Sequence, residues 1–162
     1  QASLTGHLVF STLHTNDAPS SILRLLDLGV EAFLLTATIE AIVAQRLVRR
    51  ICNDCKETFV PTDEQLMELD LKREEVKERT LYRGRGCERC NHSGYRGRRA
   101  IFEIMLLDDY LRELVTQGAS TNQLRTESRK RGMRTMRESG LLSIYEGQTT
   151  IEEVVRETIV EE

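Results

Sequence analysis

Cys52-Asn-Asp-Cys55 and Cys87-Glu-Arg-Cys90 enclose residues 56–86, and these two pairs contain all four cysteines of the chain. Two residues between paired cysteines let a tight turn direct both sulfur atoms to one point. Two such turns brought together place four thiolates at the corners of a tetrahedron, the geometry of a structural Zn²⁺ site. A four-thiolate site is closed to water, so the pattern predicts a structural metal that joins the two ends of residues 56–86, and no catalytic one.

Three alternatives compete with the zinc site. The four cysteines can form two disulfides in an oxidising compartment, or one pair can be a redox motif. The paired spacing, the missing secretory signal and the helix-rich pattern favour a metal in a reducing cytoplasm, and a redox motif leaves the second pair unexplained. His92 follows Cys90 closely and is a competing ligand.

Before the cysteines, the pattern predicts alternating strands and helices. His7–Leu13 is apolar and β-branched, as in a buried strand. Asp17 caps a helix that carries Pro19 in its first turn and ends at Gly29. Residues 31–44 are apolar on nearly every side, which predicts a core helix. Residues 45–51 are predicted to form a strand.

After Cys55, the sequence pattern predicts short helices and strands, followed by a helical C-terminal segment. Thr62 or Asp63 begins a short helix. Ser120 with Gln123, and Thr150 with Glu153, have the spacing of capping boxes. The predicted elements are helices near 62–69 and 72–79, strands at 81–83 and 98–105, and helices near 109–117, 120–132, 135–147 and 150–159.

Composition limits the function classes. The 162 residues are 40% hydrophobic and 30% charged, with a net charge of −3, typical of a globular domain and not of a nucleic-acid-binding one. The basic stretches 96–99 and 129–134 are better explained as solvated faces or ion pairs than as a nucleic-acid surface. No apolar run reaches the roughly 20 residues of a membrane span. No phosphate-binding loop and no nucleophile elbow occurs. A start without Met suggests a piece of a longer protein.

Polar residues around the first strand are candidates for a ligand site. Thr12, His14 and Thr15 lie at its carboxyl end, where α/β folds bind ligands and where they can sense a phosphate. From the residue pattern alone, a surface turn is the simpler explanation of His14, and His7 at the other end of the strand is a weaker candidate. Arg46, with Arg49 and Arg50, lies on the strand next to the cysteines, where some of these side chains can face a partner or an anion.

The sequence Gly6-His-Leu-Val-Phe-Ser-Thr-Leu-His-Thr-Asn16 resembles the histidine box of the ATPases that drive type II secretion and type IV pilus assembly. The resemblance continues through Asp17–Gly29, Ala44–Arg49, Gly86–Arg98 and Ile101–Glu103, and so covers essentially the whole chain. It implies an α/β fold, the C-terminal part of a RecA-like P-loop ATPase core with a tetracysteine zinc subdomain and a helical C-terminal subdomain. The segments would be 1–50, 51–105 and 106–162.

The same resemblance implies a hexameric motor that couples ATP hydrolysis, with Mg²⁺, to domain rotation. The motor would act on an inner-membrane platform protein from the cytoplasmic face of the membrane, without nucleic acid. His14, His7 and Thr12 would sense the nucleotide, Arg46 would lie near the nucleotide or a subunit interface, and Cys52, Cys55, Cys87 and Cys90 would bind structural zinc.

One departure from the family pattern affects the expected activity. The family's Walker A loop, aspartate box and Walker B segment precede the histidine box, so no catalytic residue is expected within these residues. The isolated chain is expected neither to bind ATP tightly nor to hydrolyse it. The alternative is a free-standing zinc-ribbon module that binds nucleic acid or protein, and a third reading is a purely structural zinc domain.

Overall fold

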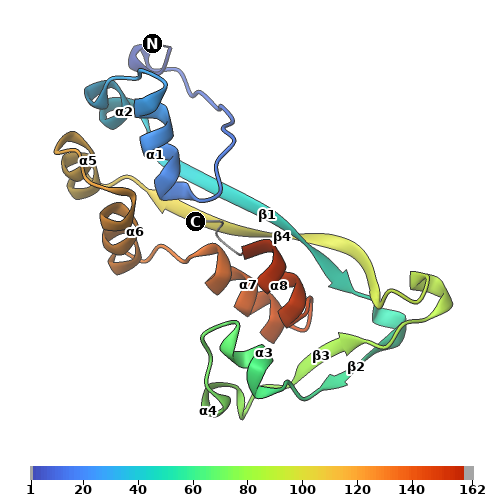
Figure 1. Cartoon of the computed structure of the whole chain (residues 1–162). Helices are drawn as coiled ribbons and strands as arrows, with labels where there is room; N and C mark the ends of the chain where they lie inside the picture. The colour runs from blue at the N-terminus through green and yellow to red at the C-terminus, as the bar shows by residue number, and fades with distance from the viewer. Residues whose placement is uncertain (1, 159–162) are drawn as a thin grey trace. The chain divides into compact units, whose positions relative to one another are not determined.

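The computed structural model of the chain describes residues 2–158 as a mixed α/β structure with two compact units. The first unit comprises the residues up to Ala44 together with Glu103–Thr135. The second comprises Gln45–Phe102 and the residues from Met136 onward. The predicted helical segment 106–162 is therefore divided: its first two helices belong to one unit and its last two to the other (Figure 1).

The first unit is built mainly from helices. α1 (Ala18–Asp27) packs on α6 (Thr121–Lys130), and α2 (Ala32–Thr38) packs on α5 (Asp109–Thr116). As predicted, Asp17 caps α1, and its Oδ1 atom accepts a hydrogen bond from the backbone N–H of Ser20 at 2.7 Å. The buried Glu103 carboxylate accepts from the N–H of Ala18 at 2.8 Å, so two carboxylates satisfy the first turn of this helix.

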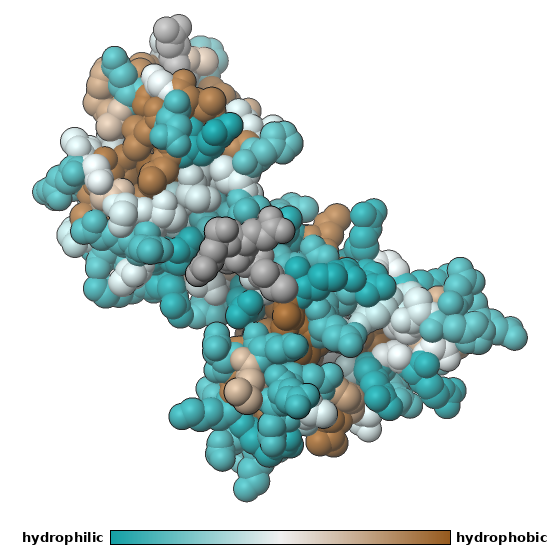
Figure 2. All heavy atoms as spheres, viewed as in Figure 1, coloured by the Kyte–Doolittle hydropathy of each residue, from teal (hydrophilic) through white to brown (hydrophobic). Residues whose placement is uncertain are grey.

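The predicted buried strand at His7–Leu13 is wrong for this structure. A 3₁₀ turn at Ser3–Thr5 leads into an irregular segment in which Leu8 and Phe10 are 84% and 87% exposed. A strand is stabilised by backbone hydrogen bonds to a neighbour, and within residues 2–158 this segment has no neighbouring strand. Figure 2 shows hydrophobic surface gathered over the region of α1 and α2, next to this segment.

The predicted core helix at 31–44 is also wrong in extent. α2 ends at Thr38, and a strand, β1 (Ala41–Ile51), begins three residues later. A run that is apolar on every side shows no periodicity that separates a helix from a strand. The β-branched Ile42 and Val43 favour the strand. Phe33 is 62% exposed, so α2 is not surrounded by protein either.

β1 pairs with β4 (Tyr95–Leu106) in a two-stranded sheet, and their arrows point in opposite directions in Figure 1. The predicted strands at 45–51 and 98–105 are thus confirmed, although both are longer than predicted. Burial alternates along β4, where Ile101, Glu103 and Met105 are buried and the residues between them are exposed. Each strand begins in one unit and ends in the other.

Residues 56–86 form an antiparallel hairpin with a small helical end. β2 (Lys56–Phe59) pairs with β3 (Leu81–Gly84) in a register that runs from Lys56 opposite Gly84 to Phe59 opposite Leu81. Two short helices, α3 (Asp63–Met67) and α4 (Arg73–Val76), join the strands. Thr62, one of the two predicted caps, begins α3 and forms a capping box with Gln65. The second helix is shorter than the predicted 72–79.

The second unit is completed by α7 (Met136–Tyr145) and α8 (Ile151–Thr158), which pack on each other. The predicted capping box at Thr150 forms only in part: the N–H of Glu153 donates to Thr150 at 3.4 Å, but the Glu153 carboxylate instead accepts from Arg49. The predicted end of this helix at Ile159 lies outside the described residues. No helix within residues 2–158 has the length and apolar character needed to cross a membrane.

Gly140→Ala is expected to destabilise the contact between α7 and α8. A Cβ atom at Gly140 would lie 2.5 Å from Cγ1 and 3.0 Å from Cγ2 of Val154, so one helix must move. Overpacking of this kind costs about 1–3 kcal/mol of unfolding free energy, measurable by denaturant unfolding. The double variant Gly140→Ala/Val154→Ala removes the clashing methyl groups, so its cost should be less than the sum of the two single costs. Additive costs would contradict the clash.

Candidate metal centre

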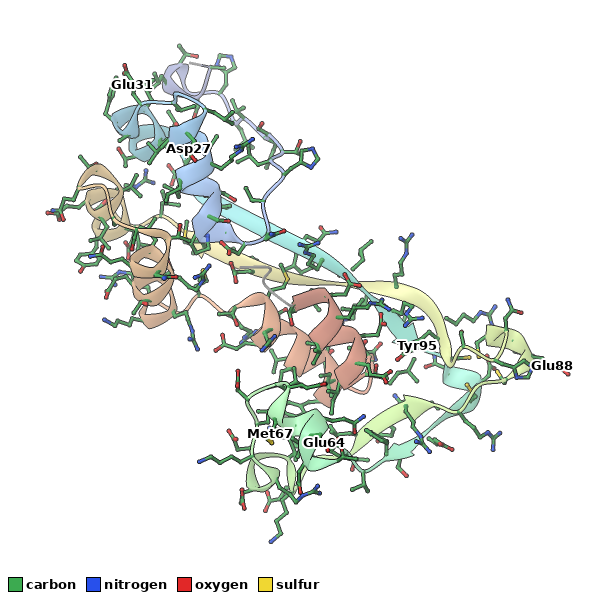
Figure 3. The ribbon with its side chains drawn as sticks, viewed as in Figure 1. Asp27, Glu31, Glu64, Met67, Glu88 and Tyr95 are labelled. Atoms are coloured by element: carbon green, nitrogen blue, oxygen red, sulfur yellow. The ribbon has the colours of Figure 1, made fainter. Side chains whose placement is uncertain are left out.

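The two cysteine pairs lie in short turns at the end of the β2–β3 hairpin. One turn (η2, Asn53–Cys55) follows β1, and the other (η3, Glu88–Cys90) precedes β4. Two backbone hydrogen bonds of 2.9 Å join the turns, from the N–H of Cys52 to the carbonyl of Gly94 and from the N–H of Arg85 to the carbonyl of Cys55. Glu88 and Tyr95 mark this end of the molecule in Figure 3.

All four sulfur atoms converge on one point. They lie within 4.8 Å of one another, and Cys52, Cys55 and Cys90 are buried. The Sγ atoms of Cys52 and Cys87 are 3.9 Å apart, as are those of Cys55 and Cys90, and Cys87 to Cys90 is 3.7 Å. Four sulfurs at about 2.3 Å from a central Zn²⁺ would be separated by about 3.8 Å. The donor set and its spacing therefore fit one tetrahedral, closed metal site.

Backbone N–H groups point at the sulfur atoms. Gly86 donates to Sγ of Cys55 at 3.3 Å, and Sγ of Cys90 accepts from Cys87 at 3.2 Å and from Gly94 at 3.3 Å. Such donors stabilise negative charge on sulfur, and they orient the ligands before a metal binds. These donors favour the thiolate form of the cysteines, which is the form that binds a metal ion.

Two glycines allow the turns to approach each other. A Cβ atom at Gly84 would lie 2.0 Å from the carbonyl oxygen of Gly94, and one at Gly86, where φ is +96°, would lie 2.8 Å from the carbonyl of His92. These contacts are with backbone, which cannot yield as a flexible side chain does. The sequence pattern did not predict this close approach. The signal in the sequence is the set of glycines around the second cysteine pair, Gly84, Gly86 and Gly94.

The pKa values of the thiols diverge. Burial raises the pKa of Cys52, and it raises the pKa of Cys55 to about 12. Burial would also raise the pKa of Cys90, but the backbone N–H groups of Cys87 and Gly94 outweigh it and lower the pKa to about 6. Four thiolates this close repel one another, so full ionisation of the cluster requires a cation among them.

The competing readings of the cysteines gain no support from this geometry. All four cysteines are free thiols. The cluster of potential metal ligands in the described part of the chain consists of these four cysteines, without His92. The side chain of Asp54, which lies between the first two cysteines, accepts from Sγ of Cys52 at 3.7 Å and forms exposed ion pairs of 3.6 Å with Arg89 and Arg96.

The candidate nucleotide-sensing residues lie elsewhere. His7, Thr12 and His14 are exposed in the irregular segment of the first unit, where the Thr5 hydroxyl lies 2.9 Å from Nδ1 of His7. Arg46 is half-buried on β1, in the second unit. Their roles in nucleotide binding stay predictions.

Comparisons with known proteins match nearly the whole chain. The model of the family described as "Type II/IV secretion system protein" matches residues 1–156. The chain is 46% identical over 159 residues to the type IV pilus assembly ATPase PilB of Thermus thermophilus, covering 98% of this chain and 18% of that protein. It is 46% identical over 158 residues to the type II secretion system ATPase E of Vibrio cholerae, covering 98% of this chain and 31% of that protein.

A third relative, the type IV pilus assembly ATPase TfpB of Acinetobacter baylyi, is 47% identical over 156 residues, which are 96% of this chain and 27% of that protein. The chain thus spans less than a third of the length of each of these curated relatives.

Proposed function

Because this chain belongs to the type II/IV secretion system protein family, we propose that it is the C-terminal part of a motor ATPase that powers type II protein secretion or type IV pilus assembly. The observation that carries the proposal is a family match over residues 1–156 together with curated relatives named as ATPases of these two systems. ATP hydrolysis belongs in this proposal to the complete protein, because the chain itself contains no phosphate-binding loop.

A free-standing zinc-ribbon module is the weaker alternative. Such a module would use only the cysteine turns and the hairpin between them, roughly residues 51–105. The family match instead includes the residues on both sides of that region, among them the histidine box. The acidic net charge also opposes a nucleic-acid partner.

The proposed architecture assigns a role to each segment. Residues 1–50 would complete a RecA-like core, 51–105 would be the zinc subdomain, and 106–162 the helical subdomain. The exposed apolar side chains of Leu8 and Phe10 support this assignment, because a segment of this composition is stabilised once it pairs within a larger sheet. Cys52, Cys55, Cys87 and Cys90 would hold Zn²⁺, which when bound supplies structural cross-linking and no chemistry on a substrate.

In the complete protein, ATP and Mg²⁺ would bind to residues outside this chain, near its histidine box. His14, with Thr12 and His7, would sense the nucleotide phosphates, and Arg46 would contact the nucleotide or a neighbouring subunit. The assembly would be a homohexamer in the cytoplasm, peripheral to the inner membrane, where it would act on a membrane platform protein. The relatives are named as ATPases of type IV pilus assembly and type II secretion, which supports a role in one of these two machineries.

His14→Ala in the complete protein tests the proposal. Loss of an imidazole that contacts a phosphate is expected to lower kcat for ATP hydrolysis by at least about tenfold. His92→Asn is the matched control, because His92 is exposed with φ of +60° and asparagine tolerates that backbone. The control should keep both activity and zinc content. A complete protein without ATPase activity would overturn the proposed function, and unchanged activity in His14→Ala would remove His14 from the mechanism.

A further inference from the structure

The hairpin insertion, residues 56–86, is held at two ends. The four cysteines lie at one end. At the other end, which Glu64 and Met67 mark in Figure 3, buried side chains of α3, α4 and β3 share one hydrophobic core with α7 and α8. The insertion contributes Leu66, Leu69, Val76 and Leu81 to this core, and the helices contribute Ile144, Ile151 and Val154. Neither the insertion nor the helical pair buries these side chains alone.

Cations reinforce the contact along its length. The Arg79 guanidinium lies 4.6 Å from the ring centroid of Tyr145 on α7. Arg137 of the same helix donates to the carbonyl of Glu68 at 3.4 Å. A Cβ atom at Gly147, just after α7, would lie 2.7 Å from Nζ of Lys56 and 2.8 Å from the ring of Tyr82. The turn between α7 and α8 therefore lies directly against the hairpin.

The same turn is bound to the strands that carry the cysteines. The N–H of Ile51, next to Cys52, donates to the carbonyl of Gln148 at 2.9 Å, and the Thr149 hydroxyl donates to the carbonyl of Arg49 at 2.8 Å. On β4, the Tyr95 hydroxyl lies 2.7 Å from that of Thr150. The helical pair thus contacts both the insertion and the strand ends that the metal site joins.

We propose that metal binding at the four cysteines and the packing of α7–α8 are energetically coupled, so that metal loading regulates the order of the C-terminal helical pair. The four thiolates hold together the points where the chain enters and leaves the insertion, next to residues 56 and 86, and the other end of the insertion packs on α7–α8. Without the metal the two turns separate, the hairpin loses its anchored end, and the shared core opens. The coupling does not extend to α5 and α6, which pack in the other unit. The inference concerns structure and holds whether or not the complete protein hydrolyses ATP.

Coupling between two sites is reciprocal, so it can be measured from the helical side. Ile151→Ala leaves a cavity in the shared core. Ile151 is 4% exposed and is not a metal ligand. The variant is expected to lower zinc affinity about 5–150-fold, the usual range of such couplings, in a competition titration with a chromophoric chelator. Leu124→Ala is the matched control, since Leu124 is equally buried but lies on α6 in the first unit. Its zinc affinity should equal that of the parent chain.

Hydrogen exchange of the parent chain, with zinc and after chelation, provides the second readout. Chelation is expected to raise exchange rates in Met136–Tyr145 and Ile151–Thr158 and to leave those of Asp109–Thr116 and Thr121–Lys130 unchanged. Equal zinc affinity in Ile151→Ala and Leu124→Ala would overturn the coupling, as would an equal response of all four helices. Should Ile151→Ala fail to fold, the milder Ile151→Val must still bind zinc more weakly than the control. If the complete protein lacks ATPase activity but these zinc-affinity and exchange results hold, only the proposed function is contradicted and the coupling stands.

Discussion

Cys52→Ser/Cys55→Ser is expected to abolish stoichiometric zinc binding and to unfold the cysteine turns. The parent chain should contain about one zinc per chain, because the four thiols form a single cluster. Structural Zn²⁺ bound to such sites contributes about 10–16 kcal/mol in apparent binding free energy, and removal of two of four ligands forfeits most of it. The lost free energy is comparable to the whole stability of an ordinary domain, about 5–15 kcal/mol.

Metal analysis and thermal unfolding measure this effect. Asn53→Ser is the matched control, because Asn53 is exposed between the same two cysteines and has no sulfur. It should retain zinc and unfold near the temperature of the parent chain. In the complete protein, the double variant should impair stability or assembly while the histidine box stays in place. A metal-free parent chain with two disulfides would refute the zinc site.

Arg49→Met/Arg156→Met should cause the second large loss, because it leaves a buried carboxylate without a cation. The Glu153 side chain is 1% exposed, and its oxygens accept from Nη2 of Arg49 at 2.6 Å and Nη2 of Arg156 at 2.9 Å. Breaking a buried ion pair on one side costs about 3–5 kcal/mol. The Arg49 guanidinium also lies 4.1 Å from the centroid of the Tyr95 ring, so the loss includes this cation–π contact, while methionine keeps much of the apolar stem.

The same variant should change the pH dependence of stability. Burial alone would raise the pKa of Glu153, but hydrogen bonds from Arg49 and attraction to both arginines outweigh it, so its pKa lies below the ordinary 4.5. A carboxylate with a lowered folded pKa contributes stability above about pH 4.5, and this contribution is lost as the pH falls through the lowered value. Without the arginines burial raises the pKa instead, so the stability gap between parent and variant should narrow as the pH falls.

Denaturant unfolding between pH 3 and pH 7 can measure both effects. Arg83→Met is the control, since Arg83 pairs with Glu57 at 2.9 Å while both side chains remain partly exposed. A surface pair of this kind contributes about 0–1 kcal/mol. An effect of the double variant no larger than that of Arg83→Met, at every pH, would contradict a buried charge at Glu153.

Local predictions were right where neighbouring residues alone decide the structure, and wrong where the structure depends on distant segments. Asp17 and Thr62 cap the helices they were expected to cap, because a capping side chain bonds only to the next turn. The helix predicted at 31–44 ended early and gave way to β1, because uniform apolarity shows no period. The segment at His7–Leu13 has the composition of a strand, but strands also need a partner, and composition specifies none.

The candidate site divides in the same way. Spacing alone identified all four cysteines as one cluster, because each pair needs only a local turn and four equivalent thiols leave one arrangement of ligands. The close approach of Gly84 to Gly94 and the thiol–backbone contacts depend on two turns far apart in the sequence. The histidine box was recognised only by resemblance, because a lone exposed His14 carries no geometric signature of its own.

The sequence by itself determined the cysteine cluster, most helix starts and the family of this chain, since each is encoded in residues close together or in a pattern matched position by position. Only the tertiary structure showed that α5–α6 and α7–α8 belong to different units, and that Glu153 serves Arg49 instead of its own helix cap. The reason is physical. An amphipathic helix specifies which face it buries, but the partner that covers that face is chosen by packing among segments distant in the chain.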